Sequence, residues 1–217
     1  MYPTIKRILD VLLSIICLIF LSPLLLLLLL IIRIDSNGSP IFQQERVGRY
    51  GDNFLIYKLR TMKTTAPHDV ATKDLLHAQS HITRVGHILR KTSLDELPQL
   101  FNILRGDMSL IGPRPLVPGE GAIHDERMKR GAYNVRPGIT GWAQVNGRDC
   151  VDPKTKAELD AIYANDVSFW LDLKIIVFSV IAVLTARGVR EGVTEFDDEI
   201  DEKRIVVEND RAREHVS

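Results

Sequence analysis

The chain has 217 residues, room for one domain of ordinary size with short appendages. Its 45% hydrophobic and 26% charged residues exclude a wholly disordered protein, and two cysteines, Cys17 and Cys150, exclude a disulfide-rich secreted domain. The net charge of zero combines a basic excess in residues 1–190 with an equal acidic excess in residues 191–217. A basic body suits phosphates or lipid headgroups, although a mild excess of this kind is also ordinary for a cytosolic domain.

The first element along the chain is an apolar run, residues 11–32, that contains no charged side chain. It is long enough to enter a membrane, because a hydrocarbon core about 30 Å thick needs roughly 20 apolar helical residues. No small-residue cleavage site follows the run, which argues against a secretory signal peptide. A plain spanning helix is the simplest interpretation of its length alone.

Ser22 and Pro23 interrupt this run near its middle. Proline has no backbone N–H and clashes with the preceding turn, so we expect a kink or break, although many spanning helices tolerate a proline. Lys6 and Arg7 precede the run and further positive residues follow it, and positive residues mark cytoplasmic flanks. We therefore predict that residues 1–35 form a re-entrant helix-break-helix hairpin that returns to the same side of the membrane.

The remaining chain predicts a small cytosolic domain over residues 36–190 and an acidic, peripheral tail over residues 191–217. Local patterns predict a strand over 54–59, helices over 82–90, 98–104 and 154–164, and irregular structure over 112–118. The apolar part of residues 169–186 is too short to span a bilayer, so we expect a helix in the membrane interface or in the core. The expected fold class is α+β, mainly helical.

Asp95 and Glu96 stand immediately before a helix that a proline opens. A capping box between Ser93 and Glu96 is the ordinary structural interpretation of this segment. That cap would put Pro98 at the fifth helical position, where its ring clashes with the preceding turn. If the helix begins near Pro98 instead, the acidic pair lies at its N-terminus, a favourable place for a phosphate.

Basic side chains with phosphate-binding chemistry occur on both sides of the acidic pair. Lys58 and Arg60 share one face if their segment is extended, and Arg114 stands between two prolines, which limits the entropy lost on clamping an anion. Each charge alone is ordinary on a protein surface, but together, in a membrane-attached chain, they indicate a diphosphate substrate. The candidate substrate-binding residues are Lys58, Arg60, Arg90, Pro113, Arg114, Pro115 and Arg136.

Five segments, in this order and spacing, resemble the monotopic phosphoglycosyl transferases, the bacterial sugar transferase family. They are the apolar run with Ser22-Pro23 and the segments 58–62, 93–100, 112–115 and 136–141. The resemblance covers roughly residues 3–190 and is to the short form of the family; the charged tail departs from it. It implies transfer of a sugar-1-phosphate from a UDP-sugar to polyprenyl (undecaprenyl) phosphate, the first membrane step of glycoconjugate assembly. The location implied is the cytoplasmic face of the bacterial inner membrane.

The resemblance also implies roles for individual residues. Asp95 is expected to be the nucleophile that carries a covalent phosphosugar, and Glu96, together with Asp95, is expected to hold Mg²⁺. Lys58 and Arg90 would ligate phosphates, and residues 113–115 would frame the uridine end. The implied partners are a UDP-sugar, polyprenyl phosphate and membrane lipid, with no nucleic acid.

Two alternatives remain. A conventional UDP-sugar glycosyltransferase moves only the sugar and usually carries an Asp-x-Asp metal site, which residues 36–190 lack. A membrane-anchored scaffold would leave Asp95 and Glu96 without a role. The sequence leaves open the sugar, with a weak preference for an amino sugar because the chain is short, as well as the pathway and whether the chain forms a homo-oligomer.

Overall fold

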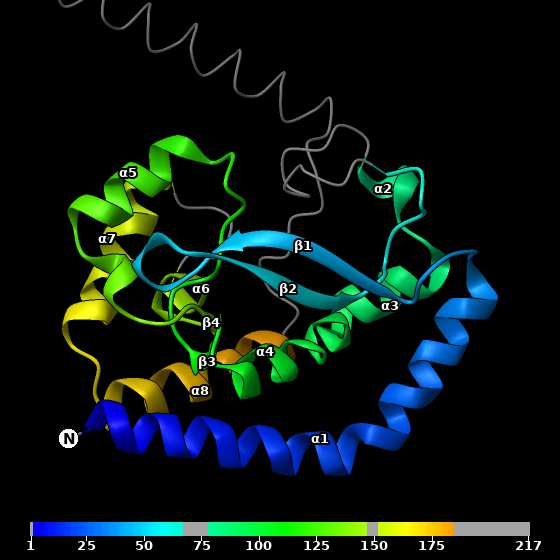
Figure 1. Ribbon diagram of the computed structural model, residues 1–217, viewed down its shortest axis with the longest axis horizontal. Coiled ribbons are helices and arrows are strands. Elements are labelled where there is room, and N and C mark those ends of the chain that lie inside the picture. Colours follow the sequence, from blue (N-terminus) through cyan, green and yellow to red (C-terminus); the bar gives the residue numbers. More distant parts are fainter. Residues whose placement is uncertain (1, 67–77, 147–151, 185–217) are drawn as a thin grey trace, which may run out of the picture.

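The computed structural model describes residues 2–66, 78–146 and 152–184. Its longest element is the N-terminal helix α1 (Tyr2–Asp35), which runs along one side of the molecule (Figure 1). In the described part of the chain, α1 is the one helix that is long and apolar enough to cross a membrane. The acidic tail predicted over residues 191–217 lies outside the described residues.

Helix α1 bends near its middle, as Figure 1 shows. Pro23 lies inside the helix and has no N–H to donate to the carbonyl of Ile19, four residues earlier. The Ser22 hydroxyl donates a hydrogen bond of 2.9 Å to that same carbonyl. The predicted break is therefore a bend through which the helix continues, and the freed acceptor is satisfied locally.

Two strands, β1 (Ile41–Val47) and β2 (Asn53–Leu59), form an antiparallel hairpin in which Ile41 is opposite Leu59. The strand predicted over 54–59 is confirmed as β2. The connection between the strands contains the one-turn helix η1 (Arg49–Gly51), where Tyr50 has the left-handed φ of 61°. A non-glycine residue with positive φ is uncommon, so this turn holds Tyr50 in a costly conformation.

The acidic pair lies between two helices, α3 (Arg84–Thr92) and α4 (Gln99–Arg105). Ser93 ends α3 in the left-handed conformation, with φ of 57°, and its side chain makes no cap hydrogen bond to the one-turn helix η3 (Leu94–Glu96) that follows. Pro98 is the N-cap of α4. The helix therefore begins beside Pro98, as its position predicts, and the capping box does not form.

The second half of the domain is built around a parallel pair of short strands. Ser109 of β3 pairs with Gly138 of β4, and Ile111 pairs with Thr140. The described residues are mainly helical with two small two-stranded sheets, which confirms the α+β prediction at that level. The other elements are α2 (Ala78–His81), β3 (Ser109–Ile111), α5 (Gly121–Lys129), η4 (Ala132–Asn134), β4 (Gly138–Thr140), α6 (Trp142–Asn146), α7 (Pro153–Asn165) and α8 (Phe169–Leu184).

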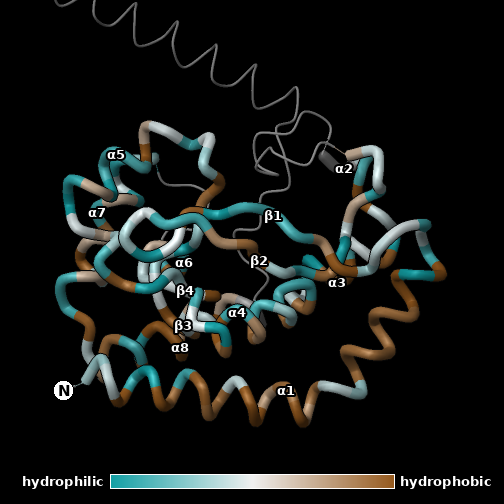
Figure 2. The backbone as a smooth tube through the Cα atoms, viewed as in Figure 1, coloured by the Kyte–Doolittle hydropathy of each residue, from teal (hydrophilic) through white to brown (hydrophobic). Residues whose placement is uncertain are grey.

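Both arms of α1 pack against the domain. After the bend, Leu28 and Ile32 join a buried cluster with Leu59 of β2 and Leu89 of α3. Before the bend, Cys17 and Leu18 pack on a cluster that contains Ile103 and Met108. The face of α1 that points away from the domain stays exposed and apolar (Figure 2).

Candidate active site

The two adjacent carboxylates lie in different surroundings. Asp95 is buried, with 9% of its surface exposed, and the described residues give its carboxylate no hydrogen bond. Oε1 of Glu96 accepts hydrogen bonds from Nζ of Lys58, at 2.9 Å, and from Nη2 of Arg114, at 3.0 Å. Consecutive residues of a helical turn point in different directions, so one carboxylate is fixed by cations while the other stays available.

Burial and nearby charges move the pKa values of the two carboxyls apart. Burial raises the pKa of Asp95; Lys58 opposes this rise, Glu96 adds to it, and Arg90 and Arg114 oppose it further. Burial would also raise the pKa of Glu96, but Lys58 and Arg114 outweigh it and lower that pKa to about 2. Asp95 is thus the more basic carboxylate and the better nucleophile, while Glu96 keeps its negative charge.

The structure brings together three of the predicted cations. Lys58 comes from the end of β2, Arg114 from the segment 112–118, and Arg90 from the last turn of α3. Nε of Arg90 donates a hydrogen bond of 2.8 Å to Oγ1 of Thr61, which directs this guanidinium. Three positive charges around two carboxylates leave the site with a net attraction for an anion.

The irregular segment 112–118 is held through its own carbonyl groups, five of which in succession have a hydrogen-bond partner. A loop fixed in this way presents the side chain of Arg114 to Glu96 with little conformational entropy left to lose. The pairs are Gly138 N to Pro113 O (3.0 Å), Arg127 Nη1 to Arg114 O (2.9 Å), Arg46 Nη1 to Pro115 O (3.2 Å), Val47 N to Leu116 O (2.9 Å) and His124 Nε2 with Val117 O (2.8 Å).

Arg127, which the sequence did not single out, ties this segment to helix α7. Its Nη2 lies 2.5 Å from Oδ2 of Asp160, and both side chains are only 1% exposed. Burial raises the pKa of Asp160, and Arg127 opposes that rise. Each residue alone resembles a surface charge, and no local pattern links residues that lie on different helices.

Arg46 of β1 is a second cation that the sequence did not predict in the site. Its Nη2 donates a hydrogen bond of 2.5 Å to Oε1 of Gln44. Burial lowers the pKa of Arg46 to about 10; Arg114 lowers it further, whereas Glu120 and Glu96 oppose the change. The alternation of side chains along a strand, which puts Gln44 and Arg46 on one face, was the signal that could have found it.

Two predicted substrate-binding residues have their contacts elsewhere. Arg60 is buried, and its guanidinium donates hydrogen bonds of 2.7 and 2.9 Å to the carbonyls of Ser36 and Asn37, just after α1. Nε of Arg136 donates a hydrogen bond of 2.8 Å to the carbonyl of Gly106, at the end of α4. The structure therefore brings neither guanidinium to the carboxylate pair. Arg60 follows the end of β2 at Leu59. Both guanidiniums bind backbone carbonyls just after a helix, α1 for Arg60 and α4 for Arg136.

A magnesium ion at the carboxylate pair would have to keep other oxygen ligands. Mg²⁺ is usually bound through one or two carboxylates, with water and substrate phosphates completing its coordination. Both hydrogen bonds to Glu96 reach Oε1, so Oε2 and the Asp95 oxygens are the carboxylate atoms able to coordinate. Among the described residues, no group of three or more His, Cys, Asp or Glu side chains forms a metal site.

Comparison with known proteins gives two curated sugar transferases that the chain matches over most of their own length. The chain is 40% identical over 186 residues to the "Uncharacterized sugar transferase EpsL" of Bacillus subtilis, which covers 86% of this chain and 90% of that protein. It is 42% identical over 191 residues to the "UDP-glucose:undecaprenyl-phosphate glucose-1-phosphate transferase" of Caulobacter vibrioides, with 83% of this chain and 70% of that protein covered.

A longer relative is similar to the chain over part of its length. The "UDP-N-acetylgalactosamine-undecaprenyl-phosphate N-acetylgalactosaminephosphotransferase" of Aeromonas hydrophila is 40% identical over 194 residues, covering 87% of this chain and 46% of that protein. The chain thus spans less than half the length of some relatives that it matches. The family model described as "Bacterial sugar transferase" matches residues 1–186. This chain belongs to the bacterial sugar transferase family.

Proposed function

We propose that this chain is a phosphoglycosyl transferase that moves a sugar-1-phosphate from a UDP-sugar to undecaprenyl phosphate. The observation that carries the proposal is the buried carboxylate of Asp95, which makes no hydrogen bond with the described residues. Next to it, Glu96 is held by hydrogen bonds from Lys58 and Arg114. A carboxylate nucleophile next to cations that hold phosphate groups is the arrangement that a covalent phosphoryl transfer needs. The names of several relatives support the same substrates.

In the first step, an oxygen of Asp95 attacks the phosphorus that carries the sugar. The bond from this phosphorus to the bridging oxygen of the diphosphate breaks, and UMP leaves with that oxygen. In the second step, a phosphate oxygen of undecaprenyl phosphate attacks the same phosphorus and releases the Asp95 carboxylate. The product is an undecaprenyl diphosphate sugar, and the free enzyme is restored.

The surrounding residues orient the substrate and stabilise its charge. Lys58 and Arg114 can pass from Glu96 to the phosphate oxygens, and Arg90 adds positive charge beside the attacked phosphorus. Arg46, whose Nη1 binds the carbonyl of Pro115 next to Arg114 in sequence, would add positive charge to the same region. Glu96 and Asp95 would hold Mg²⁺, which neutralises phosphate charge when it is bound.

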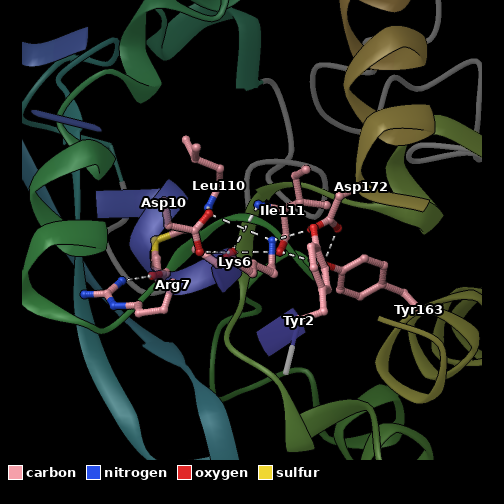
Figure 3. A network of polar contacts seen from close by, with 10 residues as sticks. Tyr2, Lys6, Arg7, Asp10, Leu110, Ile111, Tyr163 and Asp172 are labelled. Atoms are coloured by element: carbon pink, nitrogen blue, oxygen red, sulfur yellow. Dashed lines mark hydrogen bonds and ion pairs between the residues drawn. The ribbon is translucent and has the colours of Figure 1, made fainter. Parts of the chain in front are cut away.

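We also propose that α1 is a re-entrant hairpin, which puts both of its ends on the cytoplasmic side. Its first turns are attached to the domain by buried polar contacts (Figure 3). Asp172 of α8 accepts hydrogen bonds from the hydroxyls of Tyr2, at 2.5 Å, and Tyr163, at 2.8 Å, and pairs with Lys6 at 2.9 Å. A helix that crossed the membrane would carry Tyr2 and Lys6 to the side opposite these partners.

Helix α8 supports a position in the membrane interface. It begins beside the first turns of α1 (Figure 1), where Tyr2 packs on Phe169 and donates a hydrogen bond to Asp172, and most of its exposed side chains are apolar. Trp170 is 76% exposed next to Phe169, and aromatic side chains of this kind prefer the boundary between water and lipid. The exposed apolar residues of α8 include Leu173, Ile176, Val177, Phe178, Val180 and Ile181.

The decisive experiment identifies the nucleotide product. Purified full-length protein with undecaprenyl phosphate and a panel of UDP-sugars should release UMP, and Asp95→Asn protein should not. Release of UDP would mean a conventional glycosyltransferase, and no turnover of any UDP-sugar would favour a scaffold. The relatives' names include both glucose and N-acetylgalactosamine, so the panel must contain hexoses as well as amino sugars.

A further inference from the structure

Three arginines gather at the end of α4, away from the carboxylate pair. Arg7 of α1 directs its two terminal nitrogens at the carbonyls of Met108 and Leu104, at 3.4 and 3.5 Å. Arg136 binds the carbonyl of Gly106, which lies between those two residues. Both guanidiniums therefore meet over the same short stretch of backbone.

Arg49, in the turn of the β hairpin, is the third member of this arginine cluster. Its Nε donates a hydrogen bond of 2.9 Å to the carbonyl of Asn134, two residues before Arg136. Burial, Arg7 and Arg49 lower the pKa of Arg136, whereas Asp10 and Tyr50 oppose the change. Arg136 is thus close enough to both Arg7 and Arg49 to be affected by their positive charges.

The cluster lacks the counter-charge that would make it a structural ion-pair network. In the part of the chain that the structure describes, none of the three arginines forms an ion pair with a carboxylate. Asp10, the nearby acid, is instead engaged by the Ser109 hydroxyl, at 2.7 Å, and by the N–H of Leu110, at 3.2 Å.

Capping of α4 explains only part of this arrangement. Cations at the end of a helix stabilise its free carbonyls, and Arg7 and Arg136 do this. Arg136 and Arg49 each use Nε in the hydrogen bonds given above, and the described residues give their terminal N–H groups no hydrogen bond. A single cation is enough to stabilise the free carbonyls at the end of α4. Three neighbouring arginines carry more positive charge than this capping needs, and such a cluster attracts an anion.

The cluster lies beside the exposed apolar face of α1. Ile5 and Ile8, on either side of Arg7 in the helix, are 43% and 55% exposed. Tyr50, also exposed, stacks under the Arg49 guanidinium at 4.4 Å, and aromatic side chains concentrate at membrane boundaries. The positive charge is therefore at the level where lipid phosphates lie.

We infer that Arg7, Arg49 and Arg136 bind the phosphate of an anionic phospholipid headgroup, at a site separate from the catalytic one. Leu24 of α1 shares a core cluster with Leu94 and Leu97, the residues that flank the carboxylate pair. Arg7 is about 25 Å from Leu24 along the helix. A phosphate held by the cluster is thus out of reach of Asp95. The bound lipid is therefore a phospholipid of the bilayer and not undecaprenyl phosphate, the acceptor substrate.

The test counts lipid bound to the full-length protein in neutral detergent micelles by native mass spectrometry. Phosphatidylglycerol is titrated against wild type, Arg49→Gln/Arg136→Gln, and the matched control Arg84→Gln/Lys91→Gln, which removes two exposed charges on α3. Each arginine near a membrane surface contributes enough for the first double variant to bind roughly 10- to 30-fold more weakly. The control should bind like wild type, and phosphatidylcholine should bind to none of the proteins.

Several results would overturn the inference. If wild type and Arg49→Gln/Arg136→Gln bind phosphatidylglycerol with equal affinity, these arginines do not form the site. If phosphatidylcholine binds as tightly as phosphatidylglycerol, the site does not recognise the negative charge of the headgroup. Displacement by inorganic phosphate would make it a soluble-anion site, and displacement by undecaprenyl phosphate at lower concentration would make it the acceptor site. If the double variant unfolds, Arg49→Gln alone, in an exposed turn, keeps the test available. Asp95→Asn should bind phosphatidylglycerol like wild type, so the result is independent of turnover.

Discussion

Nζ of Lys58 lies 2.9 Å from Oε1 of Glu96, joining the end of the β hairpin to the one-turn helix before α4. Both side chains are mostly buried, so the pair attaches η3, which also carries Asp95, to the end of β2. Glu96 therefore holds the local backbone in place in addition to contributing a negative charge to the site. A phosphate that draws Lys58 and Arg114 away would free Glu96 at the moment when the substrate arrives.

The first prediction concerns the nucleophile. Wild type incubated with a UDP-sugar alone should release UMP and gain the mass of a phosphosugar on Asp95, because the first step does not use the lipid. Asp95→Asn keeps the shape but loses the attacking oxygen, so turnover should fall by several orders of magnitude. Intact mass measurement after an acid quench checks both. A near-normal rate for Asp95→Asn free of deamidation would contradict the assignment.

The second prediction separates the task of Glu96 from that of Asp95. Glu96→Gln removes a charge that Lys58 and Arg114 now face, and one of the carboxylates that would hold Mg²⁺. Its activity should fall, and part of the loss should be recovered as the Mg²⁺ concentration rises. The measurement is kcat against Mg²⁺ concentration for wild type and variant. If the two curves have the same dependence on Mg²⁺ concentration and differ only in maximal kcat, Glu96 does not act through the metal.

The third prediction uses the raised pKa of Asp95. Because the reaction needs the ionised carboxylate, kcat/KM should fall as pH decreases through this raised pKa. Arg114 lowers that pKa, so Arg114→Gln should raise it and move the acid limb of the profile to higher pH, in addition to reducing the rate. Arg84→Gln, an exposed change on α3, should leave the limb in place. If the acid limb of the Arg114→Gln profile stays at the wild-type pH or moves to lower pH, the limb reports the titration of a group other than Asp95.

The fourth prediction concerns the buried pair of Arg127 and Asp160. Asp160→Asn leaves an unpaired charge in a site that is 1% exposed, which should destabilise the protein by about 3–5 kcal/mol. Thermal unfolding in detergent measures this. Arg127→Met/Asp160→Leu should regain much of the stability yet stay impaired in turnover, because the Arg114 carbonyl loses its donor. Full activity of that double variant would show that the segment 112–118 needs no such support.

Local sequence patterns predict the elements whose signals are contained within a few residues. The bend at Pro23, the strand β2 and the start of α4 beside Pro98 each follow from the geometry of one residue type or from a short alternation. The same reasoning excludes the ordinary cap and puts Asp95 and Glu96 just before that helix, whereas their catalytic roles stay predictions that the family resemblance implies.

Interactions between distant segments set the rest. β1 was not predicted, because its middle reads Gln-Gln-Glu-Arg and gains its strand partner only from β2. β3 and β4 are three residues each and exist as strands only as a pair. Arg127, Arg60 and Arg136 bind backbone carbonyls of distant segments, which no local pattern contains, and the position of Arg46 depends on the pairing of β1 with β2.

The last prediction concerns the topology of α1. Replacing Ser22 and Pro23 by leucine restores a continuous apolar helix of more than 20 residues that is able to span the bilayer. Part of the protein should then shift to a form with Met1 outside, opposed by the positive charge of Lys6 and by its pair with Asp172.

A cysteine at Thr4 reports the shift, in a chain whose Cys17 and Cys150 are changed to serine. In intact spheroplasts it should resist a membrane-impermeant reagent in the parent and react in the Ser22→Leu/Pro23→Leu variant. Lys129→Cys, on an exposed helix position of the domain, is the matched control and should stay unlabelled in both. Because the Lys6–Asp172 pair holds the first arm to the domain, adding Lys6→Leu should increase labelling further. Ready labelling of the parent at Thr4 would establish a simple spanning anchor and exclude the hairpin.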